Sequence, residues 1–354
     1  MISSFTVDAF QERLRAFIRR HSRAAFLIAT LVVLGMPFLV GGSAYWVRVA
    51  TIVVMYVILV SGLNVIIGFT GLFSLGHAAF YGIGAYTSAM LTTMAGWSFW
   101  AALPLAGIVA GFFGSLIGLV TLRLRAVFLA FVTLGFGEII RIVILNWRSF
   151  TRGPLGIAGV PVPTLFGWTF DRYGYYYLVV VLAAATLASI YRVYHSRVGR
   201  AFVAIREDET AARSMGIHVF GYKVLAFSLG CFFAGIAGSF FAHFQRFVSA
   251  DSFANIESFG IITMVALGGT GSILGPVFGA LILIVLPEFF RPLQELRGVM
   301  YGLILILVIV LKPGGLAGVK GIFEKPKAQK RPGRRKPRTA GRGATGSFRG
   351  GGSR

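Results

Sequence analysis

The chain has 354 residues, of which 56% are hydrophobic and only 13% are charged, and its mean hydropathy is +0.79. This composition excludes a water-soluble globular protein and predicts an all-α polytopic membrane protein. A transmembrane β-barrel is excluded too, because its strands would appear as alternating segments of about ten residues.

Apolar runs recur along the chain, and several approach the ~20 residues that cross a bilayer core. The first run follows a basic segment, residues 1–23, without a small-x-small cleavage site, so we expect a retained helix rather than a signal peptide. About ten spans are predicted, at residues 24–40, 45–67, 74–95, 101–121, 126–146, 174–194, 220–244, 258–270, 273–289 and 298–312.

Basic clusters fix the expected orientation of these spans. They occur at Arg123 and Arg125, at residues 192–213 and from Lys312 onward, and such clusters collect on the cytoplasmic side. An even number of spans then places both termini in the cytoplasm.

Three parts of the chain follow from this pattern. Residues 1–23 form a basic cytoplasmic N-terminus, and residues 24–315 form a transmembrane domain that contains the cytoplasmic loop 195–219. Residues 316–354 are rich in Gly, Pro and Arg and hold few hydrophobic residues, so we expect a disordered tail. Attraction to anionic lipid explains its charge more simply than nucleic-acid binding does, and no nucleic-acid partner is predicted.

The residue types that carry enzyme chemistry are sparse. The single cysteine, Cys231, lies in an apolar run and is expected to be a buried packing residue. The histidines show no metal-binding spacing, and no GxxxxGK[ST] sequence occurs to hold a nucleotide phosphate. We therefore predict no catalytic residue, no metal site and no cofactor bound by this chain.

Two glycine-rich segments interrupt the apolar runs where no polar loop separates one span from the next. Residues 68–71 and 268–271 both read G-x-T-G, and another glycine follows a few residues later in each. Such paired interruptions predict broken helices beside a transport path, and the span count gives both the same orientation. For Gly82 and Gly84 the alternative, close packing of helices, is favoured. The residues assigned to the hinges and the path are Asn64, Gly68, Gly71, Ser74, Gly76, His77, Gly268, Gly271 and Gly275.

Residues 199–215 of the cytoplasmic loop predict one short amphipathic helix, with Gly216 as its C-terminal stop. Its apolar side chains are Phe202, Ile205 and Met215. The acidic triplet at 207–209 argues against a helix that rests on lipid headgroups, which would favour a basic polar face. A soluble partner that holds this helix could move the spans on either side of it.

Glu138 lies inside the predicted span 126–146, and Arg141 follows three residues later on the same helix face. A charged residue at mid-span is costly, so a partner is expected. The pair is interpreted either as a polar point in a translocation path or at a partner subunit, or as a structural ion pair, and the sequence leaves these open.

Five segments in order resemble one family, the LivM-type permeases of ATP-binding-cassette (ABC) importers for branched-chain amino acids. They are GLNVIIGFTGLFSLGHAAFYGIGAY, LRLRAVFLAFVTLGFGEIIRIVILNW, GRAFVAIREDETAARSMGI, FAGIAGSFFAHFQRFVSADSF and LGGTGSILGPVFGALIL, and together they cover most of residues 47–315.

The resemblance implies a permease subunit in the bacterial inner membrane that uses alternating access. It implies four kinds of partner: a second, homologous permease, two cytoplasmic ATPases that use ATP and Mg, an extracytoplasmic solute-binding protein, and membrane lipid. Residues 245–253 and 146–171 would face the binding protein. The residues expected to couple to an ATPase are Gly199, Arg206, Glu207, Asp208, Glu209, Arg213 and Gly216.

Two other functions stay open at this point. Permeases for urea or small amides look similar in the same motifs. An ion-coupled secondary transporter would need ionisable residues in its spans, and Glu138 is the one clear acidic candidate.

Overall fold

The computed structural model describes residues 31–38, 41–121, 126–165 and 167–289. Several predictions concern residues outside these ranges: the basic segment 1–23, the start of the span 24–40, the arginines at 123 and 125, the span 298–312 and the tail 316–354.

Helices dominate the described residues and confirm an all-α polytopic membrane protein. Five of these helices are long and apolar enough to cross a membrane, namely Ala44–Phe69, Phe99–Val120, Phe128–Asn146, Arg172–His195 and Val219–Gln245. Gly275–Glu288 is a shorter apolar helix. The total of ten spans stays a prediction.

Each predicted span between residues 45 and 289 coincides with a helix to within three residues at either end. The agreement has a physical cause, since backbone polar groups in lipid must bond within their own helix and apolar side chains must cover them. The helices are α3 (Ala44–Asn64) with the π-helical segment η1 (Val65–Phe69), α4 (His77–Thr93), α5 (Phe99–Thr121), α6 (Ala126–Asn146), α8 (Arg172–His195), α11 (Val219–Gln245), α12 (Asn255–Gly268) and α13 (Gly275–Phe289).

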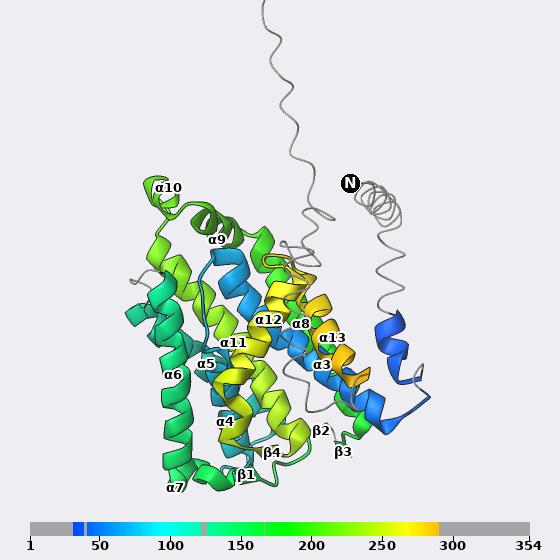
Figure 1. The fold of residues 1–354 in the computed structure, drawn as a ribbon. Helices are drawn as coiled ribbons and strands as arrows, with labels where there is room; N and C mark the ends of the chain where they lie inside the picture. Colours follow the sequence, from blue (N-terminus) through cyan, green and yellow to red (C-terminus); the bar gives the residue numbers. More distant parts are fainter. Residues whose placement is uncertain (1–30, 39–40, 122–125, 166, 290–354) are drawn as a thin grey trace, which may run out of the picture. The chain divides into compact units, whose positions relative to one another are not determined.

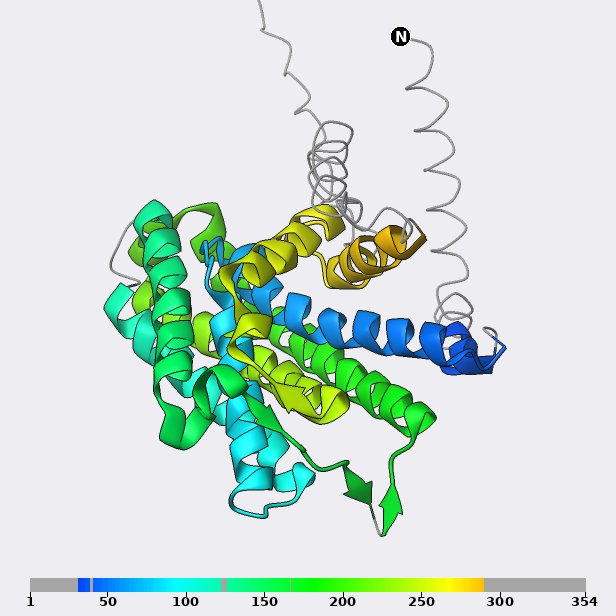
Figure 2. The same cartoon turned by 60° about the horizontal axis from the view of Figure 1, so that its bottom comes forward.

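Helix α11 lies among α3, α4 and α5 and packs along all three (Figures 1 and 2). Glycines permit this close approach. A β-carbon at Gly84 would overlap the backbone of Gly235 on α11, and one at Gly82 would lie 2.9 Å from the ring of Phe253. The expectation of close helix packing is therefore confirmed for Gly84, whereas Gly82 makes room for the Phe253 ring. Small residues at helix interfaces are the usual means of association in membranes.

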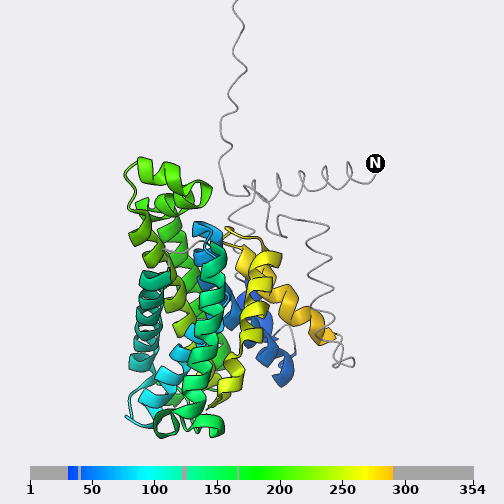
Figure 3. The ribbon, with the colours of Figure 1, turned by 60° about the vertical axis from the view of Figure 1, so that its left-hand side comes forward.

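The loop between α8 and α11 lies at one end of the long helices and contains α9 (Arg197–Glu207) and α10 (Glu209–Ser214) (Figures 1 and 3). Short elements gather at the opposite end: α7 (Arg148–Thr151), η2 (Gly153–Leu155), β1 (Ile157–Ala158), β2 (Thr164–Leu165), β3 (Trp168–Thr169), β4 (Phe247–Val248) and η3 (Ala250–Phe253).

Two antiparallel pairs of strands order this opposite end. Strand β1 pairs with β4, with Ile157 opposite Val248, and β2 pairs with β3, with Thr164 opposite Thr169. The β1–β4 pair joins residues 146–171 to residues 245–253, the two segments that the sequence assigns to one face of the membrane.

Candidate functional site

The first hinge begins where α3 changes to the π-helical segment η1, and regular helix is absent from residues 71–76 until α4 begins. Gly71 has a φ of +71°, a conformation that glycine adopts without strain. Single π-helical turns inside α-helices often mark functional sites. The broken helix that the glycines predict is present here.

The second hinge separates α12 from α13. Gly269 and Gly271 have φ values of +103° and +80°, and a β-carbon at Gly268 would overlap the backbone of Gly275. Pro276 lies in the first turn of α13, where an amide N–H has no helical acceptor, so a proline is tolerated. This helix break was also expected.

The two hinges touch each other through Asn64. Its side-chain Nδ2 donates to the Ser272 carbonyl at 2.8 Å, and its Oδ1 accepts from the Gly271 amide at 2.9 Å. A β-carbon at Gly68 would lie 2.5 Å from the Gly271 nitrogen. Asn64 is buried, and both of its polar atoms bond the other hinge, so its observed partners are backbone groups of the protein.

Another predicted hinge residue, Gly76, lies against α6 instead. A β-carbon at Gly76 would overlap the backbone of Thr133, and the Leu75 amide donates to the Thr133 hydroxyl at 2.9 Å. Ser74 and His77 are fully buried. The contacts of Leu75 and Gly76 with Thr133 join the start of α4 to α6 and not to the second hinge.

The single helix predicted at residues 199–215 is wrong, because the loop holds two helices that meet at Asp208. Asp208 is extended, with φ −158° and ψ 110°, and its carboxylate accepts hydrogen bonds from the Thr210 and Ala211 amides. It thus caps the N-terminus of α10 and ends α9. The hydroxyl of Ser196 caps α9 in the same way, with bonds from the amides of Val198 and Gly199.

The predicted stop at Gly216 is confirmed. Its φ is +80°, its amide donates to the Arg213 carbonyl, and the Ile217 amide donates to the Ala212 carbonyl, which together form a Schellman motif. The apolar residues of the loop divide into two kinds. Phe202 and Ile205 are buried against this chain, whereas Met215 is 82% exposed.

Glu209 anchors the loop to the transmembrane helices. Its carboxylate contacts the Lys223 Nζ at 2.6 Å and an Arg213 guanidinium nitrogen at 3.2 Å. Lys223 lies in the first turns of α11 and is only 8% exposed, so its charge needs this partner. Lys223 was not among the predicted site residues, although a lysine at the start of an apolar span is a signal that could have found it.

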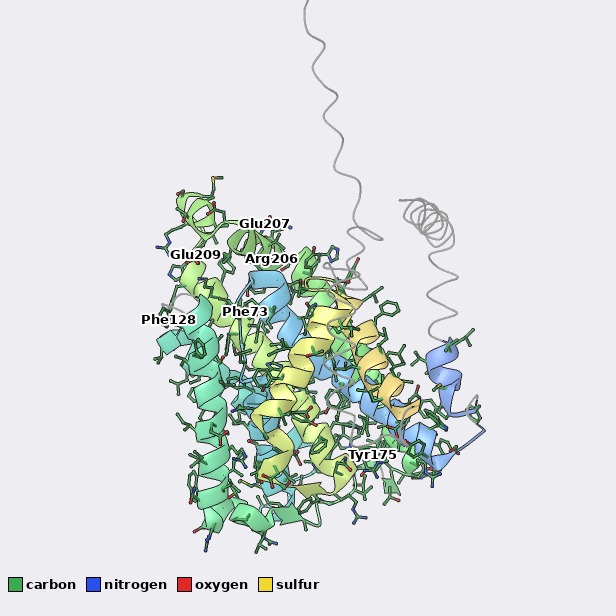
Figure 4. The ribbon with its side chains drawn as sticks, viewed as in Figure 1. Phe73, Phe128, Tyr175, Arg206, Glu207 and Glu209 are labelled. Atoms are coloured by element: carbon green, nitrogen blue, oxygen red, sulfur yellow. The ribbon has the colours of Figure 1, made fainter. Side chains whose placement is uncertain are left out.

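Arg206 is an exposed residue of the last turn of α9, and its side chain reaches the end of α3, next to both hinges (Figure 4). Its Nη1 donates to the carbonyl of Gly68. Glu207, the next residue, is exposed and ends α9.

The predicted pair in α6 is present and is part of a larger polar cluster. Arg141 contacts Glu138 at 2.9 Å and Asp251 at 3.2 Å, and the Asn255 amide donates to Glu138 at 3.2 Å. Asp251 and Asn255 could not be found from local spacing, because they are 110 and 117 residues away from their partners. The cluster links α6 to η3 and α12.

Within the described ranges, no group of three or more His, Cys, Asp or Glu side chains is arranged to hold a metal ion. Cys231 is buried in α11, and a β-carbon at Gly114 would lie 2.7 Å from its sulfur, so the thiol fills a helix contact.

The family described as "Branched-chain amino acid transport system / permease component" matches residues 45–309. The chain is 42% identical over 316 residues to the high-affinity branched-chain amino acid transport system permease protein LivM of Salmonella typhimurium. The matched region covers 82% of this chain and 74% of LivM. LivM of Escherichia coli is 41% identical over the same shares. The autoinducer 2 import system permease protein LsrC of Yersinia pseudotuberculosis is 29% identical over 51% of this chain and 50% of its own. No solved structure matches.

Proposed function

This chain belongs to the family of branched-chain amino acid transport system permease components, and from that premise we propose that it is the permease subunit of an ABC importer for branched-chain amino acids. The observation that carries the substrate class is the 42% identity to LivM over 82% of the chain. The chain is a multi-pass inner-membrane protein and is not itself an enzyme.

ATP and Mg are used by partner ATPases in this proposal, and the cytoplasmic loop is where an ATPase docks. The exposed side chains there include Glu207 on α9, and Arg213 and Met215 at the end of α10. They combine an acid, a base and an apolar side chain on two short helices. The buried side chains of Phe202 and Ile205 pack α9 against the rest of the chain. Such a mixed and rigid surface suits a protein partner better than lipid headgroups.

The end of the molecule that holds α9 and α10 faces the cytoplasm in this proposal, and both termini are on that side. The opposite end, with α7 and the β1–β4 pair, faces outward and receives the binding protein (Figure 3). This assignment is supported by the basic residues of the loop, since arginine and lysine collect on the cytoplasmic side.

A second permease subunit is proposed to pack beside this chain. Helix α6 supports this, because its outer face is largely uncovered and includes Phe128, Phe131 and Ile142, each 49–64% exposed (Figure 4). The side chain of Glu138 on the same helix is 43% exposed. Lipid does not solvate a carboxylate, so this region fits a protein neighbour or a water-filled path better than the hydrocarbon core.

Transport is proposed to follow alternating access. The binding protein delivers the solute outside, and ATP binding moves the cytoplasmic loop, which reorients the helices at the two hinges and opens the path inward. The observation that supports this mechanism is the contact of the loop with the same hinge segments that break α3 from α4 and α12 from α13.

Assembly and stimulation of ATPase activity test this function. The chain is co-expressed with candidate permease, ATPase and binding-protein subunits from its own organism, and the complex is purified through a tag on this chain. We expect the ATPases to co-purify and their activity in liposomes to rise when leucine-loaded binding protein is added. Stimulation by urea-loaded but not by leucine-loaded binding protein would reject the substrate class, and failure of any ATPase to co-purify would reject the importer.

A further inference from the structure

We propose that Arg206 is the positioning residue that joins the cytoplasmic loop to both hinges, so that one movement of α9 acts on both helix breaks together. This inference rests on the proposed function, because it concerns how movement of an ATPase reaches the transmembrane helices. It also changes the role expected of Arg206, which the sequence assigned to contact with the ATPase itself.

The contacts of Arg206 reach three backbone positions in two segments of the chain. Its Nη1 donates to the carbonyl of Gly68, which is 138 residues earlier. A β-carbon at Gly271 would overlap this same guanidinium nitrogen, and one at Gly71 would lie 3.4 Å from Cγ of Arg206. The aliphatic part of the side chain thus lies along the first hinge while its charged end lies between the two hinges.

The chemistry of this contact suits an arginine. The carbonyl of Gly68 lies at the end of a helix. The last carbonyls of a helix receive no hydrogen bond from an N–H of the same helix, so they need a donor from elsewhere. A guanidinium supplies several N–H groups on a long side chain and stays charged. At Gly271 the absence of a side chain makes room for the guanidinium, because a β-carbon there would overlap Nη1.

Helix α9 is built to transmit a movement to Arg206. Phe202 and Ile205 on the same helix are 0% and 4% exposed, so α9 is held firmly on the transmembrane helices. The other polar anchor of the loop, Glu209 with Lys223, joins α10 to α11 and does not include a hinge. Within the described residues, Arg206 is therefore the charged side chain through which the loop bonds a hinge.

The test uses the full complex in liposomes, with leucine uptake and ATP hydrolysis measured in the same sample. Arg206→Gln removes the charge and shortens the side chain. The matched control is Arg200→Gln, which makes the same change at an exposed arginine on the same helix. We expect Arg206→Gln to lower the leucine transported per ATP hydrolysed severalfold, because α9 would lose its bond to the Gly68 carbonyl. Arg206→Lys, which keeps a donor, should fall between, and Arg200→Gln should stay near the wild type.

A second readout separates transmission from a merely structural role. Hydrogen exchange of the amides in residues 67–72 and 269–274 is measured in the wild-type complex with and without ATP trapped by vanadate. We expect both segments to change together in the wild type, and neither to change in Arg206→Gln although the ATPases still trap nucleotide. The wild-type measurement stands even if the variant does not assemble.

Two results would overturn the inference alone: an unchanged uptake per ATP in Arg206→Gln, or a wild-type response to ATP in one hinge without the other. In either case ATP-driven leucine uptake by the wild type would leave the proposed function intact. Absence of that uptake from an assembled wild-type complex would instead overturn the proposed function and this inference with it.

Discussion

The side chain of Asn64 at the end of α3 bonds the backbone amide of Gly271, a residue 207 positions later, at 2.9 Å. The bond joins two hinges that belong to opposite halves of the chain. The Asn64 amide group also donates to the Ser272 carbonyl. Asn64 therefore bonds two backbone groups in the break between α12 and α13, where the backbone lacks hydrogen-bond partners within a helix. The two glycine segments therefore form one site.

Asn64→Ala should separate the hinges. The substitution removes two partly buried hydrogen bonds and leaves the amide of Gly271 and the carbonyl of Ser272 without this partner, at a cost of about 2–3 kcal/mol. We expect a lower unfolding midpoint in detergent and a loss of transport. Asn146→Ala is the control, because Asn146 is exposed and bonds only the Ile142 carbonyl of its own helix. Equal unfolding midpoints for the two variants would show that the cross-hinge bonds contribute nothing.

Alanine at Gly68 or Gly271 should be poorly tolerated. A β-carbon at Gly68 would crowd Asn64 and the Gly271 nitrogen, and one at Gly271 would meet Arg206 in a left-handed backbone conformation. Overpacking of this kind costs about 1–3 kcal/mol. Expression, folding and uptake of each variant are compared with those of Gly260→Ala.

Gly260 is a suitable control because it lies in α12, and a β-carbon there would have no neighbour within 4 Å. Alanine at this position should leave transport unchanged and stabilise the helix by up to about 1 kcal/mol. Wild-type stability and uptake in Gly68→Ala and Gly271→Ala would contradict the close approach of the hinges.

The bond between Glu209 and Lys223 can be tested by exchanging the two charges. Glu209→Lys leaves Lys223 buried beside a like charge, and Lys223→Glu leaves two acids together, so each change should destabilise the loop by about 2 kcal/mol or more. The double variant restores an ion pair and should recover most of the stability and of the co-purification of ATPases. If the double variant is as unstable as the sum of the two single ones, the residues do not interact.

The proposed orientation predicts which surfaces a membrane-impermeant maleimide can reach. Trp168 and Met215 are 83% and 82% exposed and lie at opposite ends of the long helices. In a Cys231→Ser background, Trp168→Cys should react in intact spheroplasts, and Met215→Cys should react only after the membrane is made permeable. The reverse pattern would place the cytoplasmic loop on the outside and remove its access to ATP.

The sequence alone was sufficient to locate the described spans and both helix breaks. The cost of unpaired backbone groups in lipid makes spans visible as apolar runs, and positive-φ glycines such as Gly71 and Gly271 make the breaks visible as G-x-T-G. The contact between the hinges was not visible, because the spacing of Asn64 from Gly271 carries no local signal.

The loop shows the same limit at shorter range. Asp208 was interpreted as part of a charged helix face, but an aspartate followed by a helical sequence is also a common N-cap, and the structure uses it so. Glu209 has one partner, Arg213, on its own helix, but the other, Lys223, lies on α11, and periodicity within the loop does not report that contact. The π-helical turn at Val65–Phe69 likewise depends on its neighbours, and the sequence pattern did not predict it.

Uptake of labelled leucine by vesicles that contain the assembled complex tests the central claim most directly. It is measured with and without ATP in the compartment of the ATPases, and with excess unlabelled valine or urea. We predict uptake that requires ATP and is reduced by valine but not by urea. Leucine uptake that proceeds equally without ATP, driven by an ion gradient, would contradict the assignment as a permease of an ABC importer.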